Sequence, residues 1–255
     1  MASEMNNKIA SGSTVDNNEV EFFAAISDSW WDSKGPFKPL HQLNPTRLKF
    51  IRGAITDHFG LDATSKTPFA DLKLLDIGCG GGLISEPMSR LGADMTGVDA
   101  SEKNIHVARH HAEETGVTVN YLHTTAEALA ETGEKFDAII NMEVIEHVAD
   151  VNAYLAACKS LLKPNGIMLL STINRTAKAF LFAIIGAEYV LRWLPKGAHD
   201  WNKFLTPKEL QTACEKAGFE ASEATGFIFT PFGQKWSLSA SDLDVNFVMV
   251  STPPK

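Results

Sequence analysis

Apolar residues between positions 72 and 172 alternate between short continuous runs and stretches with helical spacing. The short runs, each expected to form a strand, lie at 72–77, 94–98, 118–122, 136–141 and 166–172. Helical spacing occupies the intervals near 83–91 and 103–114. Strands joined by single helices need right-handed crossovers, so the pattern predicts an α/β fold with a mostly parallel sheet and helices on both faces. Two later runs, 219–229 and 244–250, have no helix between them and predict an antiparallel hairpin at one edge.

Two helices are expected before this alternation. In the first, apolar residues recur at helical spacing from 20 to 26, and the helix is expected to end at Trp30-Trp31. The second is expected to start after Pro45 and to end at Phe59.

Composition indicates one globular domain behind a short tail. Of the 255 residues, 44% are hydrophobic, which allows one sizeable core. Residues 1–16 carry few apolar side chains and are expected to be a mobile tail. The predicted organisation is a single domain over 17–255, with N-terminal helices at 17–60 and an apolar insertion at about 175–197.

Charge and cysteine content disfavour several classes of protein. The formal net charge of -8 argues against a nucleic-acid partner, because phosphates are bound through a surplus of Lys and Arg. Cys79, Cys158 and Cys214 form no CxxC pair, so neither a disulfide framework nor a zinc knuckle is indicated, and a cytoplasmic compartment fits. The sequence shows no signal-peptide pattern and no run of about 18 apolar residues, so no transmembrane helix is expected.

The first strand of the α/β pattern ends in a glycine-rich turn. Gly78 and Gly80 allow positive φ and close approach of a ligand to the backbone. The dinucleotide fingerprint GxGxxG would need a glycine at 83, where this chain has Leu83. Asp76 would repel a pyrophosphate but attract the ammonium and sulfonium groups of S-adenosylmethionine. Asp99 ends the second strand, where a carboxylate can accept hydrogen bonds from both ribose hydroxyls.

Residues after the third and fourth strands are further candidates for contact with this cofactor. Ala126 and Glu127 lie where the adenine edge is expected, although any polar loop would look similar. Met142 ends the fourth strand, where it either lies beside the cofactor or belongs to the core.

The acidic segment that follows the fourth strand can supply metal ligands. If it forms a helical turn, Glu143, Glu146 and His147 lie at i, i+3 and i+4 and share one face. Two carboxylates and an imidazole can bind Mg²⁺, Mn²⁺ or Zn²⁺. The alternative is structural, because carboxylates also stabilise helix N-termini.

Several peptides on both sides of the glycine turn resemble those of a known family. They are Trp-Trp-Asp at 30–32, Phe-Lys-Pro-Leu-His at 37–41, Leu-Asn-Pro-Thr-Arg-Leu at 43–48, Leu-Asp-Ile-Gly-Cys-Gly-Gly-Gly at 75–82 and Pro-Lys-Gly-Ala-His-Asp at 195–200. Together they resemble the ubiquinone biosynthesis O-methyltransferase family over nearly the whole chain beyond the tail. The glycine turn is typical of all methyltransferases of this superfamily, whereas the peptides at 37–41 and 195–200 indicate this family.

The resemblance implies a class I S-adenosylmethionine-dependent methyltransferase fold, Rossmann-like, with seven strands. It implies methylation of ring hydroxyls on polyprenylated phenol and catechol intermediates, as a 2-polyprenyl-6-hydroxyphenol methylase and a 3-demethylubiquinol 3-O-methyltransferase. Arg47, Gly78, Asp99 and Met142 match the family's positions that contact S-adenosylmethionine, and a guanidinium such as that of Arg47 can bind the methionine carboxylate bidentately. The family's association with a divalent cation, Mg²⁺ or another, favours metal binding after the fourth strand.

Methyl transfer to a phenol also needs the proton to be withdrawn by a base or a cation, because an unperturbed phenol has a pKa of about 10. His147 and Glu143 are the candidate catalytic residues. His199 is a further candidate for the base, but a structural role, as a helix cap or a core residue, explains it equally well.

The insertion contains an apolar run at 179–187 with basic residues on both sides. It is too short to span a bilayer, but an apolar helix with basic flanks over about 177–194 suits peripheral attachment to the inner face of the membrane that holds polyprenyl substrates. A lid or core helix over the substrate pocket is the alternative. Other ubiquinone-biosynthesis proteins are a further class of expected partner.

Three rival interpretations make different predictions. An oxidoreductase would bind a nicotinamide cofactor, which Leu83 and Asp76 disfavour. A scaffold without turnover would bind S-adenosylmethionine but form no methylated product. A methyltransferase of the same fold could act on carbon or nitrogen of another small molecule, against which only the family-specific peptides argue.

Overall fold

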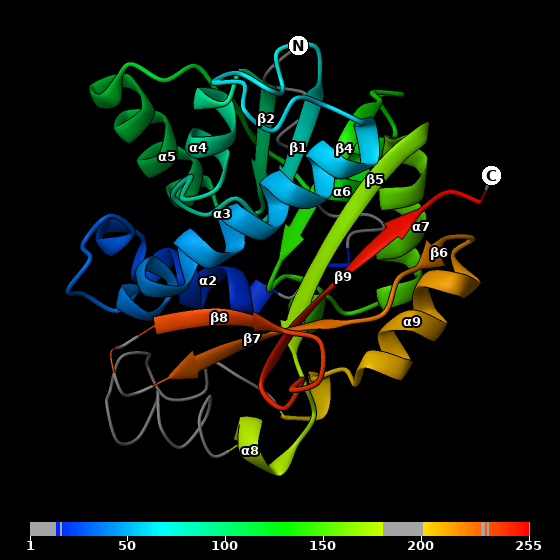
Figure 1. Ribbon diagram of the computed structural model, residues 1–255. Helices are drawn as coiled ribbons and strands as arrows, with labels where there is room; N and C mark the ends of the chain where they lie inside the picture. The colour runs from blue at the N-terminus through cyan, green and yellow to red at the C-terminus, as the bar shows by residue number, and fades with distance from the viewer. Residues whose placement is uncertain (1–13, 16, 181–200, 231–232, 234, 255) are drawn as a thin grey trace.

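The computed structural model describes residues 14–15, 17–180, 201–230, 233 and 235–254, and these form one sheet flanked by helices (Figure 1). The described strands are β1 (Lys73–Ile77), β2 (Asp94–Asp99), β3 (Asn120–His123), β4 (Phe136–Met142), β5 (Leu162–Ile173), β6 (Glu220–Ala221), β7 (Thr225–Thr230), β8 (Lys235–Ser239) and β9 (Asn246–Thr252). Their order is β3-β2-β1-β4-β5-β9-β7-β8, with β6 also paired to β9. Strands β1 to β5 are parallel to one another and the remainder are antiparallel, which confirms the predicted α/β class.

The helices cover both faces of the sheet. They are α2 (Asn17–Ala25), α3 (Lys38–Phe59), α4 (Ser85–Arg90), α5 (Glu102–Thr115), α6 (Ala126–Ala130), α7 (Val151–Leu161), α8 (Ala177–Ala179) and α9 (Pro207–Lys216), with 3₁₀ turns η1 (Ser27–Ser29), η2 (Ile145–His147) and η4 (Trp201–Lys203). In Figure 1, α3 lies in front of the sheet.

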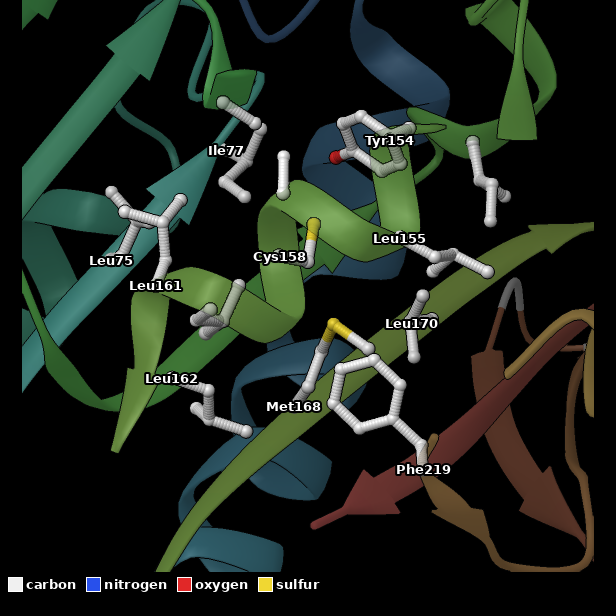
Figure 2. Packing of buried hydrophobic residues seen from close by; sticks show 14 of the residues in the cluster. Leu75, Ile77, Tyr154, Leu155, Cys158, Leu161, Leu162, Met168, Leu170 and Phe219 are labelled. Atoms are coloured by element: carbon white, nitrogen blue, oxygen red, sulfur yellow. The ribbon is translucent and has the colours of Figure 1, made fainter. Parts of the chain in front are cut away.

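Two apolar clusters form on the two faces because successive side chains of a strand point to opposite sides. On β1, Leu74 packs with residues of α3 and α4, whereas Leu75 packs with residues of α6, α7 and α9. Figure 2 shows the second cluster, in which Leu161 of α7 lies beside Leu75 of β1, and Met168 of β5 lies beside the ring of Phe219. The two cores fix the sheet on both sides, so its strand ends form a rigid frame.

Two sequence-based expectations for the N-terminal helices are wrong in detail. Helix α3 begins at Lys38 and contains Pro45, although proline removes a backbone donor from a helix interior. Long-range contacts hold this first part: Leu43 is buried, and His41 Nε2 lies 2.8 Å from the backbone oxygen of Trp30. Helix α2 ends at Ala25, and η1 follows before Trp30.

The antiparallel edge is more elaborate than the predicted hairpin and seven strands. The described residues form nine strands because β6 and β8 are added. Strand β9 lies between β5 and β7, and β7 forms its hairpin with β8. The last strand therefore joins the parallel part of the sheet, and β8 forms the edge.

The predicted tail and insertion fall mainly outside the described residues. Thr14 is nevertheless buried, and Val15 forms an antiparallel bridge with Val148, so these two residues do not belong to a mobile tail. Of the insertion, α8 and its neighbour Phe180 are described, while 181–200 are not. None of the described helices is long and apolar enough to cross a membrane.

Candidate functional site

A cavity of about 330 Å³ opens where β1, β2 and β4 end. Its lining combines the glycine turn after β1, the start of α3, the segment that contains η2, and residues of α2 and β8. Parallel sheets of this kind bind ligands at the carboxyl ends of their strands. Every residue that sequence analysis assigned to the cofactor lines this cavity except Gly80, which belongs to the same glycine turn.

The glycine turn approaches its neighbours too closely for larger side chains. Gly78 has φ of +68°, and a Cβ there would lie 2.4 Å from Val144 Cγ2. Gly80 has φ of +53°, and a Cβ there would lie 2.3 Å from the ring of Trp30. The turn is therefore packed between the segment after β4 and the indole that precedes α3, which explains why both positions need glycine.

The carboxylate of Asp99 organises the turn from the end of β2. It accepts hydrogen bonds from the backbone N–H of Gly80 at 2.9 Å and of Ser101 at 2.8 Å. It also accepts one from Asn104 Nδ2 at 3.2 Å, and Asn104 Oδ1 in turn accepts from Trp30 Nε1 at 2.9 Å. Burial nonetheless raises the pKa of Asp99 above its usual value. A ligand bound here meets a carboxylate whose position is fixed by three donors.

Asp76 is the most desolvated acid of the cavity, with 2% of its surface exposed. Ser85 Oγ donates to its Oδ2 at 2.6 Å. Burial raises the pKa of Asp76 to about 7, and this outweighs the stabilising effects of Ser85 and Arg47 on the charged form. A cationic ligand would supply the charge that the protein leaves uncompensated.

Arg47 is buried at the cavity, where it forms an ion pair with Glu143. Its Nε has no hydrogen-bond partner among the described residues. Burial lowers the pKa of Arg47 to about 10, opposed by the nearby acids Glu146 and Asp76. At this value the guanidinium remains charged at neutral pH and can bind a further carboxylate.

The prediction that Glu143, Glu146 and His147 share one face of a helical turn is wrong. Glu143 has φ of +54° and precedes η2, so the helical spacing does not extend to it. Its carboxylate is held by Arg47 and by Ser171 Oγ, which donates at 2.9 Å. The described residues contain no group of three or more His, Cys, Asp or Glu side chains placed to hold a metal ion.

Glu146 and His147 do line the cavity. Glu146 is 3% exposed; its Oε2 accepts from Thr172 Oγ1 at 2.9 Å, and its Oε1 has no partner among the described residues. The ring of His147 meets that of Phe23 edge to face, with centroids 5.4 Å apart. His147 is therefore positioned by packing against α2.

The remaining predicted cofactor residues lie around the same cavity. Met142 ends β4 at the cavity and also packs into the core, so the two interpretations of this residue are compatible. Ala126 begins α6, which Thr125 caps by accepting from the backbone N–H of Ala128. The carboxylate of Glu127 accepts a hydrogen bond from Thr14 Oγ1.

Sequence reasoning missed the residues that close the cavity from distant parts of the chain. Trp30 and Asn104 belong to the Asp99 network, and Thr14 reaches Glu127. Trp236 of β8 lines the cavity from the far edge of the sheet. A polar Asn104 on the buried side of α5 was a usable signal, whereas Trp236 lies in a stretch without any motif.

The chain is similar to known methyltransferases. Residues 50–224 match the methyltransferase domain family. A ubiquinone biosynthesis O-methyltransferase from Dinoroseobacter shibae is 57% identical over 94% of this chain and 97% of its own length. One from Cereibacter sphaeroides is 55% identical over 95% of this chain and 98% of its own length. Among solved structures, a SAM-dependent methyltransferase from Thermotoga maritima superposes with a TM-score of 0.63 at 18% identity, covering 92% of this chain and 100% of that one.

The raised pKa of Asp76 predicts a specific pH dependence of stability. Between its ordinary value of 3.8 and about 7, the folded chain keeps a proton that the unfolded chain releases, so this group destabilises the fold increasingly as the pH rises. Asp76→Asn removes that dependence while keeping an acceptor for Ser85. We expect the variant to gain on the order of 1–3 kcal/mol over the wild type between pH 5 and pH 8. Urea denaturation without added ligand measures the free energy of unfolding of both proteins at each pH. A difference between variant and wild type that stayed the same at every pH would contradict the prediction.

Proposed function

We propose, since this chain belongs to the ubiquinone biosynthesis O-methyltransferase family, that it transfers the methyl group of S-adenosylmethionine to ring hydroxyls of polyprenylated phenols and catechols. The second of the two proposed methylations converts 3-demethylubiquinol to ubiquinol. The observation that carries the proposal is the pair of carboxylates of the buried Asp76 and the partly buried Asp99, both with a raised pKa, at the strand ends beside the glycine turn. They favour a cofactor that is cationic at one end and has ribose hydroxyls at the other.

Each part of the cofactor has a complementary group in the cavity. Asp76 attracts the ammonium and sulfonium region, and Asp99 accepts from the ribose hydroxyls, while Gly78 and Gly80 let the backbone come close. We assign the adenine edge to Ala126 and Glu127, and a contact with the cofactor to Met142. These residues come from four successive strand ends, as the fold requires.

Arg47 is assigned to the methionine carboxylate of the cofactor. In the structure its guanidinium pairs with Glu143, and its Nε has no partner among the described residues. A carboxylate ligand can therefore bind the unoccupied side of the guanidinium or replace Glu143 there. Replacement would free Glu143 to face the substrate.

The rest of the cavity suits an aromatic ring with an apolar chain. Its lining there is mainly apolar and includes Val20, Phe23, Leu40, Ile173 and Trp236. Transfer requires a phenolate oxygen about 3–3.5 Å from the methyl carbon and in line with the sulfur, so the walls act chiefly by positioning the ring.

We assign removal of the phenol proton to His147. It lines the cavity, and Phe23 orients its ring. Glu143, the other candidate, is held by Arg47 and Ser171 and is less available in this arrangement. Glu143, Glu146 and His147 as placed do not fit a divalent cation, so no step is derived through one.

A turnover assay tests the proposed function directly. Purified protein with labelled S-adenosylmethionine and a short-chain 3-demethylubiquinol analogue is expected to give the O-methylated product, identified by mass. Asp99→Asn should weaken cofactor binding by about 10- to 100-fold, because a neutral amide accepts more weakly than a carboxylate. Asp94→Asn, at the exposed other end of β2, is the matched control and should bind normally. Binding without any product would favour the scaffold interpretation.

His147→Ala tests the assignment of the base. We expect kcat to fall by about 10²- to 10⁴-fold while cofactor affinity stays unchanged. The remaining activity should rise with pH toward about 10, because the substrate then ionises without help. A variant that kept the wild-type rate and pH profile would show that another group takes the proton.

We propose that the protein works at the cytoplasmic face of a membrane, because the proposed substrates carry apolar prenyl chains, and that residues 177–194 make a peripheral contact there. Most of this segment lies outside the described residues. Within the described part, Phe180 beside α8 is 40% exposed, which is large for an apolar side chain. Lys178 next to it forms ion pairs with Asp242 and Asp244, so anionic headgroups would compete with these carboxylates for its charge. Pathway proteins as partners remain a prediction.

Liposome sedimentation tests this contact. Exchanging Phe180 and Phe182 for Asp should abolish sedimentation with vesicles that contain anionic lipid, because the apolar area is lost and negative charge is added. Thr118→Asp with Asn120→Asp adds the same charge at exposed positions by the opposite edge of the sheet and should not change it. Equal sedimentation of all three proteins would contradict the membrane contact.

A further inference from the structure

The indole N–H of Trp236 is a buried donor without a partner. The nitrogen has almost no exposed surface and no hydrogen-bond partner among the described residues, although Trp236 lines the cavity. The indole donors of Trp30 and Trp31 are both satisfied, by Asn104 Oδ1 and by the backbone oxygen of Gly81, each at 2.9 Å. Leaving such a donor unpaired costs about 1–3 kcal/mol, so its position needs an explanation.

The surroundings of Trp236 hold its ring in place. Its backbone oxygen accepts from Thr46 Oγ1 of α3 at 3.2 Å, next to Arg47. Its ring packs on Phe229 across the β7–β8 hairpin, with centroids 5.2 Å apart. It also packs against the apolar cluster that contains Leu43 and Phe227. The hairpin and α3 hold the ring from two sides, so a ligand oxygen that reaches the indole nitrogen must displace the side chains that cover it.

We infer that Trp236 is a specificity-determining residue, which donates a hydrogen bond to a substrate ring oxygen other than the one that is methylated. This inference rests on the proposed function. An indole nitrogen can only donate, so the ligand must present an acceptor. A prenyl chain has no acceptor, whereas a catechol or quinol ring carries further oxygens. The bond orients the ring at the wall of the cavity formed by β8 and selects rings with a second oxygen.

Trp236→Phe removes the donor and keeps an aromatic ring. We measure dissociation constants of a short-chain prenylated catechol and of the matched monophenol, both with S-adenosylhomocysteine bound so that no transfer occurs. The variant should bind the catechol about tenfold more weakly, equivalent to about 1.4 kcal/mol, and the monophenol as the wild type does. Its kcat/KM for the catechol should fall by a similar factor. Trp201→Phe is the matched control and should change neither constant, because Trp201 is not among the residues that line the cavity.

Four results would overturn the assignment. Equal weakening of catechol and monophenol would mean that Trp236 acts by packing alone, and unchanged binding of both would mean that its N–H is not used. Loss of S-adenosylhomocysteine affinity would move the donor to the cofactor carboxylate near Arg47. A wild-type protein that methylated no catechol would refute the proposed function and the assignment together. If the wild type does methylate the catechol, a failed prediction for Trp236→Phe refutes only the role of Trp236 and leaves the proposed function in place.

Discussion

Desolvation of acidic side chains at the strand ends is the constraint on which the site depends. The described residues that line the cavity include five carboxylates, those of Asp76, Asp99, Glu127, Glu143 and Glu146, against a single guanidinium. Burial disfavours the charged forms of Asp76 and Asp99, so the pKa of both is raised, that of Asp76 to about 7. The folded state tolerates the unfavourable free energy of burying these carboxylates because the sheet and its two cores hold them in position. A cation that enters the cavity recovers part of that free energy.

The same constraint explains the dense hydrogen bonding around Asp99. Three donors fix its carboxylate, and the chain Asp99, Asn104, Trp30 links the end of β2 to the segment that precedes α3. Because Trp30 touches the glycine turn, the N-terminal helices help to form the cavity as well as the core. Their removal would expose the turn and release Asn104.

Most of the candidate site could be predicted from the sequence alone, but the residues that surround it could be predicted less well. The βα alternation, the glycine turn, Asp76 and Asp99 are encoded locally, since each follows a strand and can be located by spacing. The helical turn expected at Glu143 was wrong, because its backbone conformation depends on Ser171 and Arg47, which are distant in sequence. Pro45 similarly appeared to be a helix start, although tertiary contacts extend α3 in front of it. Trp236 depends on strand pairing that no local pattern reveals.

The position of β9 has a consequence for the order in which the protein is assembled. Strands β7 and β8 reach the parallel sheet only through β9, which follows both of them in the chain. During synthesis from the N-terminus, the half of the cavity at the ends of β1 to β4 can form early, while the hairpin that carries Trp236 pairs with the sheet only when the final strand is made. A ribosome-bound chain lacking β9 would thus have the part of the cavity at the parallel strand ends, with the wall formed by β8 still missing.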